Sequence, residues 1–249
     1  MMNGNSQNLL SVLIPNHNYG AFIAEAIASV RDQSYSPIEL VVVDDGSTDD
    51  SVAVIEAALA GADNLYRVEF MALKENIGKL GAMNAALDKL CGEYCIILDA
   101  DDRLEPGYGE RCIAEIKAGQ KEDPRLGFVY SDCLLMDKGG AIIERGRSTP
   151  FDKDLLQQYS YVPEPALMMT RALLEIAPMD ETIRVATKHH KWLRIVENGW
   201  VGKHIAEPLF YYRMHDRNLS GIGKRVITEV EAGRRGERIL SGYWPTSYA

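Results

Sequence analysis

Four mostly apolar segments in about the first hundred residues alternate with segments of helical periodicity, and no other feature constrains the fold as strongly. The apolar segments are rich in Val, Ile and Leu, and they cover residues 9–15, 38–44, 65–73 and 93–99. The helical segments lie between them, at residues 21–33, 51–62 and 79–92. Apolar strands that alternate with helices indicate an α/β fold with a mostly parallel sheet flanked by helices.

Three polar motifs directly follow three of these strands. They are PNHN at 15–18, DDGS at 44–47 and DADD at 99–102. In parallel α/β sheets, ligands bind beyond the carboxyl ends of the strands. We therefore expect the three motifs to lie on one edge of the sheet and to form a ligand site there.

The pattern changes after about residue 125. Two strands around the turn KGG (138–140) predict a hairpin. We also expect three helices, at 152–159, 170–177 and 187–198. A strand pair at 200–206 and 208–214 and a last helix at about 224–240 should follow them. We interpret the chain as one domain, 1–249. Its first half, about 9–125, is of the nucleotide-binding type, its second half, about 126–215, is more variable, and a C-terminal helix and tail cover about 216–249.

Composition excludes several classes of function. The net charge of -9 argues against a protein that binds nucleic acid through a general positive field. The four cysteines lack the CxxC pairs of a zinc site, and no secretory leader is recognisable, so we expect reduced thiols in the cytoplasm. No apolar run approaches the roughly 20 residues that cross a bilayer. We expect contact with the inner face of a membrane to be peripheral at most.

The segment CIILDADD (95–102) places three aspartates within four positions at the end of an apolar strand. Crowded carboxylates repel one another and resist ionisation. Oxygen ligands suit Mg²⁺ or Mn²⁺, which proteins typically hold with one or two carboxylates plus substrate phosphates. A divalent ion would relieve the repulsion and bind a diphosphate. A solvated turn that leads into a helix near Pro106 is the other interpretation, and these residues alone leave both open.

The DDGS motif also allows two interpretations. Asp44 and Asp45 can end a strand before a turn at Gly46, with Ser47 or Thr48 as the cap of the next helix. Acidic residues at strand ends of nucleotide-binding sheets can instead accept hydrogen bonds from a base or ribose. The motif alone does not decide between them.

The motifs together resemble the family 2 glycosyltransferases, which have the GT-A fold. The resemblance rests on the order PNHN, DDGS, N-x-G (76–78) and DADD, and it extends to MDETI, WLRIVENGW and EPLFYYRMH, up to about residue 215. It implies an inverting enzyme of polysaccharide or glycoconjugate assembly. Such an enzyme moves a sugar from a nucleotide-sugar, usually a UDP-sugar, to a hydroxyl of a glycan or glycolipid and uses Mn²⁺ or Mg²⁺. By the same resemblance, residues 126–215 form the acceptor side.

The resemblance also implies roles for individual residues. The nucleotide-sugar would contact Pro15, His17, Asn18, Asp44, Asp45, Asn76, Lys79, Asp99 and Arg213. The ring of His17 would stack on the base. The metal would be held by Asp101, Asp102 and His215.

One departure from the family concerns the general base. Alignment on WLRI (192–195) puts Lys188 where relatives carry a catalytic carboxylate, and a charged ammonium cannot accept a proton. Three hypotheses follow. His190 or His189 acts as the base, since a neutral imidazole accepts protons near pH 7. Alternatively, Asp180 or Glu181 reaches the site. In the third hypothesis, the chain binds a sugar nucleotide without transferring the sugar.

Two other functions compete with a transferase. A catalytically silent sugar-nucleotide-binding or scaffold protein would keep the motifs without the base. A nucleotidyltransferase would carry a glycine- and lysine- or arginine-rich phosphate loop, whereas PNHNYGAF has neither lysine nor arginine. The last predicted helix ends near Arg234, Arg235 and Arg238. Its glycines and mixed charges favour a packing helix or a homodimer contact over a membrane contact.

Overall fold

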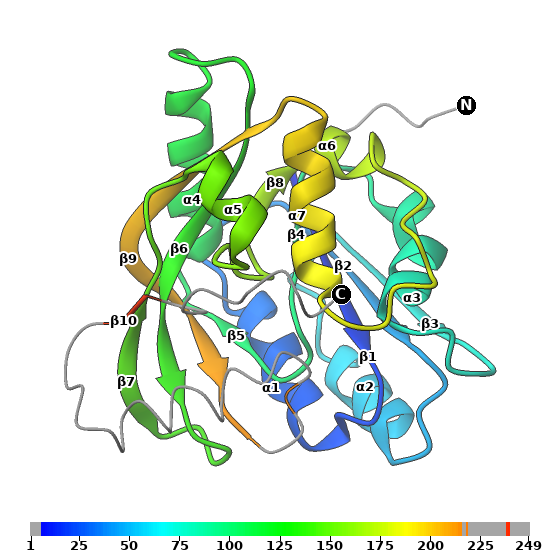
Figure 1. Ribbon diagram of the computed structural model, residues 1–249. Coiled ribbons are helices and arrows are strands. Elements are labelled where there is room, and N and C mark those ends of the chain that lie inside the picture. Colours follow the sequence, from blue (N-terminus) through cyan, green and yellow to red (C-terminus); the bar gives the residue numbers. More distant parts are fainter. Residues whose placement is uncertain (1–5, 216–217, 219–237, 240–249) are drawn as a thin grey trace.

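The computed structural model describes residues 6–215, 218 and 238–239. Four strands of the first half are β1 (Ser6–Asn16), β2 (Ile38–Asp44), β3 (Arg67–Ala72) and β4 (Gly92–Ile97). The helices between them are α1 (Gly20–Arg31), α2 (Ser51–Leu59) and α3 (Lys79–Ala86), the last followed by a 3₁₀ turn, η1 (Leu87–Lys89). β1 pairs in parallel with both β2 and β4, and β2 pairs in parallel with β3. The predicted parallel, helix-flanked sheet is confirmed (Figure 1).

The chain after β4 continues the same sheet, mainly with antiparallel pairs. Its strands are β5 (Arg103–Leu104), β6 (Leu126–Met136), β7 (Ile142–Arg147), β8 (Leu167–Met169), β9 (Val201–Arg213) and β10 (Arg238–Ile239). Its helices are α4 (Tyr108–Gly119), α5 (Lys153–Gln158), α6 (Thr170–Leu174) and α7 (Thr187–Glu197). β8 lies antiparallel between β4 and β6 and joins the two halves. The predicted hairpin is β6–β7, and the three predicted helices correspond to α5, α6 and α7.

The predicted strand pair at 200–206 and 208–214 is wrong, because one strand, β9, runs through both segments beside β6. Proline has no backbone N–H to donate to a ladder. The pairing of β6 with β9 shifts register around Asp132, which lies opposite Pro208, and the strand continues past the proline. The predicted helix at 224–240 lies outside the described residues except for Arg238–Ile239, which form strand β10.

The apolar core is continuous across both halves. All residues of β2 are buried, and its apolar side chains belong to one hydrophobic cluster with Phe128 of β6 and Trp192 of α7. These two rings lie 4.8 Å apart between centroids, and the Trp192 indole N–H donates to the carbonyl of Pro163. The packing fixes α7 against the second half of the sheet. Among the described residues, no helix has the length and apolar character that a membrane span requires.

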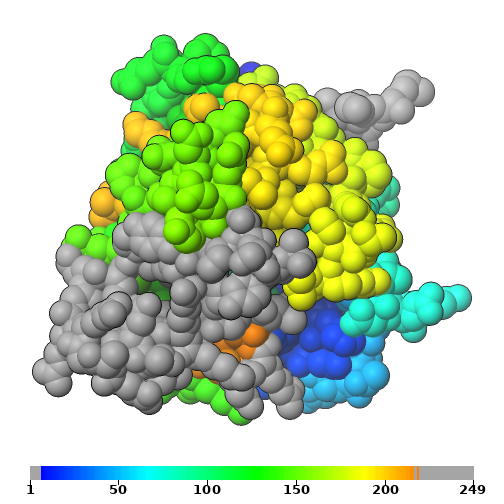
Figure 2. All heavy atoms as spheres, in the orientation of Figure 1, coloured from blue at the N-terminus to red at the C-terminus, as the bar shows by residue number. Residues whose placement is uncertain are grey.

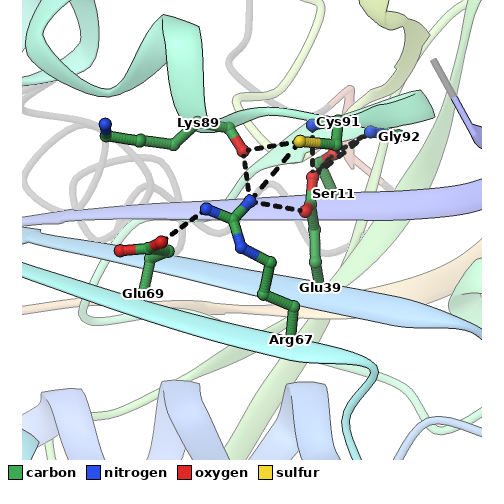
Figure 3. Close-up of polar contacts among 7 residues, drawn as sticks. All are labelled: Ser11, Glu39, Arg67, Glu69, Lys89, Cys91 and Gly92. Carbon is green, nitrogen blue, oxygen red and sulfur yellow. Dashed lines mark hydrogen bonds and ion pairs between the residues drawn. The ribbon is translucent and has the colours of Figure 1, made fainter. Parts of the chain in front are cut away.

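A polar network ties the strands together at the amino ends of β2, β3 and β4, opposite the motif edge (Figure 3). The carboxylate of Glu39 is completely buried and accepts hydrogen bonds from the hydroxyl of Ser11 and the backbone N–H of Cys91. The Ser11 oxygen accepts in turn from the N–H of Gly92, at 2.8 Å. Arg67 lies 3.3 Å from Glu39 and also donates to the carbonyl of Lys89. The network therefore fixes the register of β1, β2, β3 and β4.

We expect Glu39→Ala to lower the free energy of unfolding by about 2 to 3 kcal/mol, because it leaves buried donors at Ser11 and Cys91 without an acceptor. The matched control is Glu69→Ala, which removes the more exposed partner of the same Arg67 and should cost less than about 1 kcal/mol. Urea unfolding followed by tryptophan fluorescence measures both values. Equal losses for the two variants would contradict a stabilising role of the buried network.

Candidate functional site

The motif edge is built first by the ends of β1 and β2, where Asn16 lies in register with Asp44. The side-chain amide of Asn16 donates to the carboxylate of Asp44 at 2.8 Å. That carboxylate also accepts from the backbone N–H and the hydroxyl of Ser47, at 2.9 and 2.6 Å. Asp44 is buried, and its oxygens are occupied with fixing the turn after β2.

Asp45 performs a similar task for the next loop. Its two carboxylate oxygens accept from the backbone N–H groups of Ile77 and Gly78, at 2.8 and 2.9 Å. These N–H groups come directly before α3, so the carboxylate holds the start of that helix to the edge of the sheet. Asn76 is exposed on the same loop, and its side-chain oxygen accepts from the Gly78 N–H at 3.0 Å.

The PNHN motif is locked to the same edge. The ring of His17 bonds through Nδ1 to the carbonyl oxygen of Asp45 at 2.8 Å. Asn18 has a φ of 59°, which asparagine tolerates, and its side-chain oxygen accepts from the backbone N–H of Thr48. Pro15 lies within β1, opposite Val43 of β2. PNHN and DDGS thus contact each other at one edge of the sheet, as their position after neighbouring strands predicted.

Asp99, Asp101 and Asp102 gather just beyond β4. Each offers a carboxylate oxygen, and these oxygens all lie within 4.8 Å of one another. Asp101 and Asp102 are 8% and 1% exposed, whereas Asp99 is more open. Burial and the charges of Asp101 and Asp99 raise the pKa of Asp102 well above its ordinary value. Burial, with Glu164 and Asp101, likewise raises the pKa of Asp99 despite the ammonium of Lys79.

The end of β9 reaches this cluster from more than a hundred residues away. The backbone N–H of Arg213 donates to Asp102 at 2.9 Å, and its Nε donates to the carbonyl of Asp101. The guanidinium is completely buried, lies over the ring of Phe22 and pairs with Glu25 at 2.8 Å. Arg213 therefore reaches the aspartates, and its side chain braces the loop through contacts within the protein.

His215 is the second residue that this segment brings to the aspartates. Its Nε2 lies 2.9 Å from a carboxylate oxygen of Asp101. The ring stacks on Phe22 with centroids 5.1 Å apart, and the ring of Tyr19 meets it edge-on. Packing against Phe22 of α1 and against Tyr19 thus places an imidazole beside Asp101, and its role as a metal ligand stays a prediction.

A chain of ion pairs leads from the aspartates towards α7. The Lys79 Nζ lies 2.5 Å from Asp99 and 3.4 Å from Glu164. The other oxygen of Glu164 accepts from the Nζ of Lys191 at 2.6 Å, and Lys191 is completely buried. Burial alone would raise the pKa of Glu164, but Lys191 and Lys79 lower it to about 2. Burial would lower the pKa of Lys79, but Asp99 and Glu164 outweigh it and raise that pKa.

Sequence reasoning missed Glu164 and Lys191. The available signal was a charged residue between two prolines in the otherwise apolar segment YVPEPALMM (161–169). A glutamate in such a run must be paired when the segment is buried. Its partners come from two distant helices, and no spacing in the sequence indicates them.

The two faces of α7 carry different groups. Lys188 lies three residues before Lys191, and the charges that act most strongly on it are those of Glu164, Asp99 and Lys79. Lys188 lies one helical turn before Lys191, which pairs with Glu164. In Figure 2, the yellow surface of the segment before α7 adjoins the blue surface of the β1–α1 segment.

The structure does not bring His190 or Asp180 to the aspartate cluster. Burial and Arg194 lower the pKa of His190, and the nearest carboxylate charges on it are Asp180 and Glu197. Asp180 accepts from the backbone N–H and hydroxyl of Thr182, at 2.9 and 2.6 Å, and closes a local turn. The ring of His189 bonds to the carbonyl of Leu156. Their catalytic roles stay predictions.

The sequence of the chain is similar to those of known proteins. A family model described as glycosyl transferase family 2 matches residues 11–173. A chondroitin synthase of Escherichia coli is 30% identical over 213 residues, which cover 85% of this chain and 30% of that protein. A hyaluronan synthase of Pasteurella multocida is 29% identical over 236 residues, covering 92% of this chain and 23% of that protein. The chain thus spans about a third or less of these relatives' length.

Solved structures show the same architecture. TarS of S. aureus in complex with UDP has a TM-score of 0.62 at 18% identity, over 82% of this chain and 60% of that chain. A mannosyltransferase, PcManGT of Pyrobaculum calidifontis, in complex with GDP-Man and Mn²⁺ has a TM-score of 0.64 at 20% identity. That match covers 92% of this chain and 65% of the other. The predicted fold class is confirmed.

Proposed function

The chain belongs to glycosyl transferase family 2, and on this premise we propose that it moves a sugar from a UDP-sugar to a hydroxyl of a glycan or glycolipid. It is a glycosyltransferase with the GT-A fold. The donor, inversion at the anomeric carbon and dependence on a metal are the proposed parts. The observation that carries the proposal is the cluster of three carboxylates at the carboxyl end of β4.

The cluster fits a divalent metal, Mn²⁺ or Mg²⁺. The three carboxylates are crowded, two of them are buried, and the pKa of Asp102 is raised. Such carboxylates supply the oxygen ligands that these ions prefer. We assign Asp101, Asp102 and His215 as the ligands, since His215 lies beside Asp101. When bound, the ion would supply positive charge that stabilises the leaving diphosphate.

The remaining site residues are proposed to bind the donor. The rigid edge formed by PNHN and DDGS would line the base and ribose, and the α3 side would meet the diphosphate and sugar. The first group is Pro15, His17, Asn18, Asp44 and Asp45, and the second is Asn76, Lys79, Asp99 and Arg213. Lys79 reaches the aspartate cluster, and its raised pKa keeps the ammonium charged, so it can donate hydrogen bonds to the ligand. Complexes of TarS with UDP and UDP-GlcNAc, and of PcManGT with GDP-Man, support a nucleotide-sugar as ligand.

His190 and Asp180 remain the candidate bases. The lowered pKa of His190 keeps its ring neutral at pH 7, and its Nε2 has no hydrogen-bond partner among the described residues. Such a nitrogen can accept a proton. His190 lies on α7 and Asp180 in the segment before this helix, and the charge of Asp180 acts on His190, so an acceptor hydroxyl would have to approach these two side chains. The competing hypothesis, sugar-nucleotide binding without transfer, draws support from Lys188, which stands where relatives carry a catalytic carboxylate.

The cellular setting follows from the same chemistry. Among the described residues all four cysteines are free thiols, and three of them are buried. This supports the cytoplasm as the compartment. Peripheral contact with the inner face of a membrane and a homodimer contact stay predictions, since the segment that prompted them lies largely outside the described residues.

We expect Asp101→Asn and Asp102→Asn each to weaken Mn²⁺-dependent binding of UDP by at least about tenfold, or 1.4 kcal/mol. The loss follows from removing a charged metal ligand at a buried position. Calorimetric titration with UDP, with Mn²⁺ and with a chelator, measures it, and Asp63→Asn at an exposed site is the matched control. UDP affinity that is the same with and without Mn²⁺ in the wild type would exclude the metal site.

We expect His190→Ala to reduce sugar transfer by at least about a hundredfold while UDP affinity changes less than about twofold, because general-base help contributes 10²–10⁴ in rate. Asp180→Asn serves as the parallel test of the other candidate. UDP release from a panel of UDP-sugars, with and without glycan acceptors, measures transfer and hydrolysis. Wild-type rates in both variants would leave neither residue as the base, and UDP binding without turnover in the wild type would favour the silent binding protein.

A further inference from the structure

We propose that Glu164 is a positioning residue for donor binding, because it holds the ammonium of Lys79 beside the aspartate cluster at the end of β4. The Lys79 Nζ lies between two carboxylates, 2.5 Å from Asp99 and 3.4 Å from Glu164. Asp99 belongs to the cluster with Asp101 and Asp102, whereas Glu164 approaches the ammonium from outside it. This role rests on the proposed function, in which Lys79 binds the diphosphate or sugar of the donor.

The backbone around Glu164 is fixed on both sides. Pro163 and Pro165 flank it, and a proline ring restricts the backbone angle φ. The carbonyl of Pro163 accepts from the indole N–H of Trp192 at 3.2 Å, and the carbonyl of Pro165 accepts from the hydroxyl of Tyr108. Both aromatic side chains are fully buried. The carboxylate of Glu164 is therefore presented from a segment that has little freedom to move.

A second lysine anchors the carboxylate itself. One oxygen of Glu164 accepts from the Nζ of Lys191 at 2.6 Å, and this Nζ lies 4.3 Å from the ring centroid of Trp192. Glu164 and Lys191 are 4% and 0% exposed, so water does not compete for their pairing. The other oxygen, Oε2, is buried and accepts no hydrogen bond among the described residues, and it is the oxygen 3.4 Å from Lys79. A buried carboxylate oxygen without a hydrogen bond attracts a nearby cation, so Glu164 draws Lys79 towards α7.

Lys79 needs this second partner because its side chain is long and three acids crowd on one side of it. An ammonium on a four-carbon stem has many rotamers and carries three donors. The oxygens of Asp99, Asp101 and Asp102 lie within 4.8 Å of one another. Attraction from this side alone would let the ammonium move in among the acids and take the place of a metal ion. The opposed attraction of Glu164 holds it at the border of the cluster. The Lys79 side chain is 16% exposed there, so a donor oxygen can reach it.

The first test removes the buried pair as a unit. Glu164→Gln alone would leave Lys191 buried without an anion, so the test variant combines it with Lys191→Met. In calorimetric titrations with UDP and Mn²⁺, we expect this double variant to lose at least about fivefold in affinity, because a charged partner of Lys79 becomes neutral. The control is Glu39→Ala, which breaks the buried network at the opposite edge of the sheet and should change the affinity less than about twofold.

A cycle with Lys79→Met shows whether Glu164 acts through Lys79. In that background, the Glu164→Gln and Lys191→Met pair should change UDP affinity less than about twofold, because the side chain that Glu164 positions is absent. A purely structural role would give the same loss with and without Lys79, and that result would overturn the proposal. Wild-type UDP affinity in the double variant would overturn it as well.

A second measurement uses the wild type and needs neither UDP nor a folded variant of Glu164. In NMR spectra of isotope-labelled protein, we expect the side-chain ammonium of Lys79 to show couplings across hydrogen bonds to the carboxylate carbons of both Asp99 and Glu164. Its signal is assigned by its absence from Lys79→Arg. Coupling to Asp99 alone would overturn the positioning role. Failure of UDP to bind the wild type would overturn the proposed donor instead, and the NMR spectra would still decide whether Glu164 holds Lys79.

Discussion

The crowding of three carboxylates at the end of β4, two of them buried, is the constraint on which the rest of the structure depends. Asp102 is almost fully buried and lies beside two other acids. Its carboxylate accepts a hydrogen bond from the backbone N–H of Arg213. Uncompensated charge of this kind is costly in a protein interior. Distant segments therefore converge on it: Lys79 from α3, and Arg213 and His215 from the end of β9. These segments surround the aspartates, and the carboxylate oxygens that accept no hydrogen bond are available to ligate a cation.

Compensation extends beyond the acids themselves into a row of alternating charges. Lys79 lies between Asp99 and Glu164, and Glu164 lies between Lys79 and Lys191. Lys191 and Lys79 lower the pKa of Glu164 to about 2 against the effect of burial, and Asp99 and Glu164 raise the pKa of Lys79. The row connects the motif edge to α7 without an apolar interruption. The charges of Glu164 and Asp99 also act on Lys188 and favour its charged form against the effect of burial.

The parallel half and its motif edge could be predicted because both depend on local signals. Consecutive residues are enough to recognise the apolar runs, the helical periods and the turns after β1, β2 and β4. Parallel pairing then places the carboxyl ends of these strands together. Local signals failed at β9, where the proline suggested a break and the long pairing with β6 overrode it. They also failed at Glu164 and Lys191, since the pairing of two charges from separate segments leaves no periodic trace. The aspartates of DDGS show a third limit: the motif was visible, but only the fold reveals that backbone N–H groups occupy both carboxylates.

The measurement that tests the central claim most directly is a crystal structure with UDP and Mn²⁺, with anomalous difference density recorded at the manganese edge. The account predicts one manganese peak within coordination distance of Asp101 and Asp102, in contact with the diphosphate oxygens of UDP. UDP bound elsewhere, or bound at the motif edge with no manganese peak beside the aspartates, would contradict it.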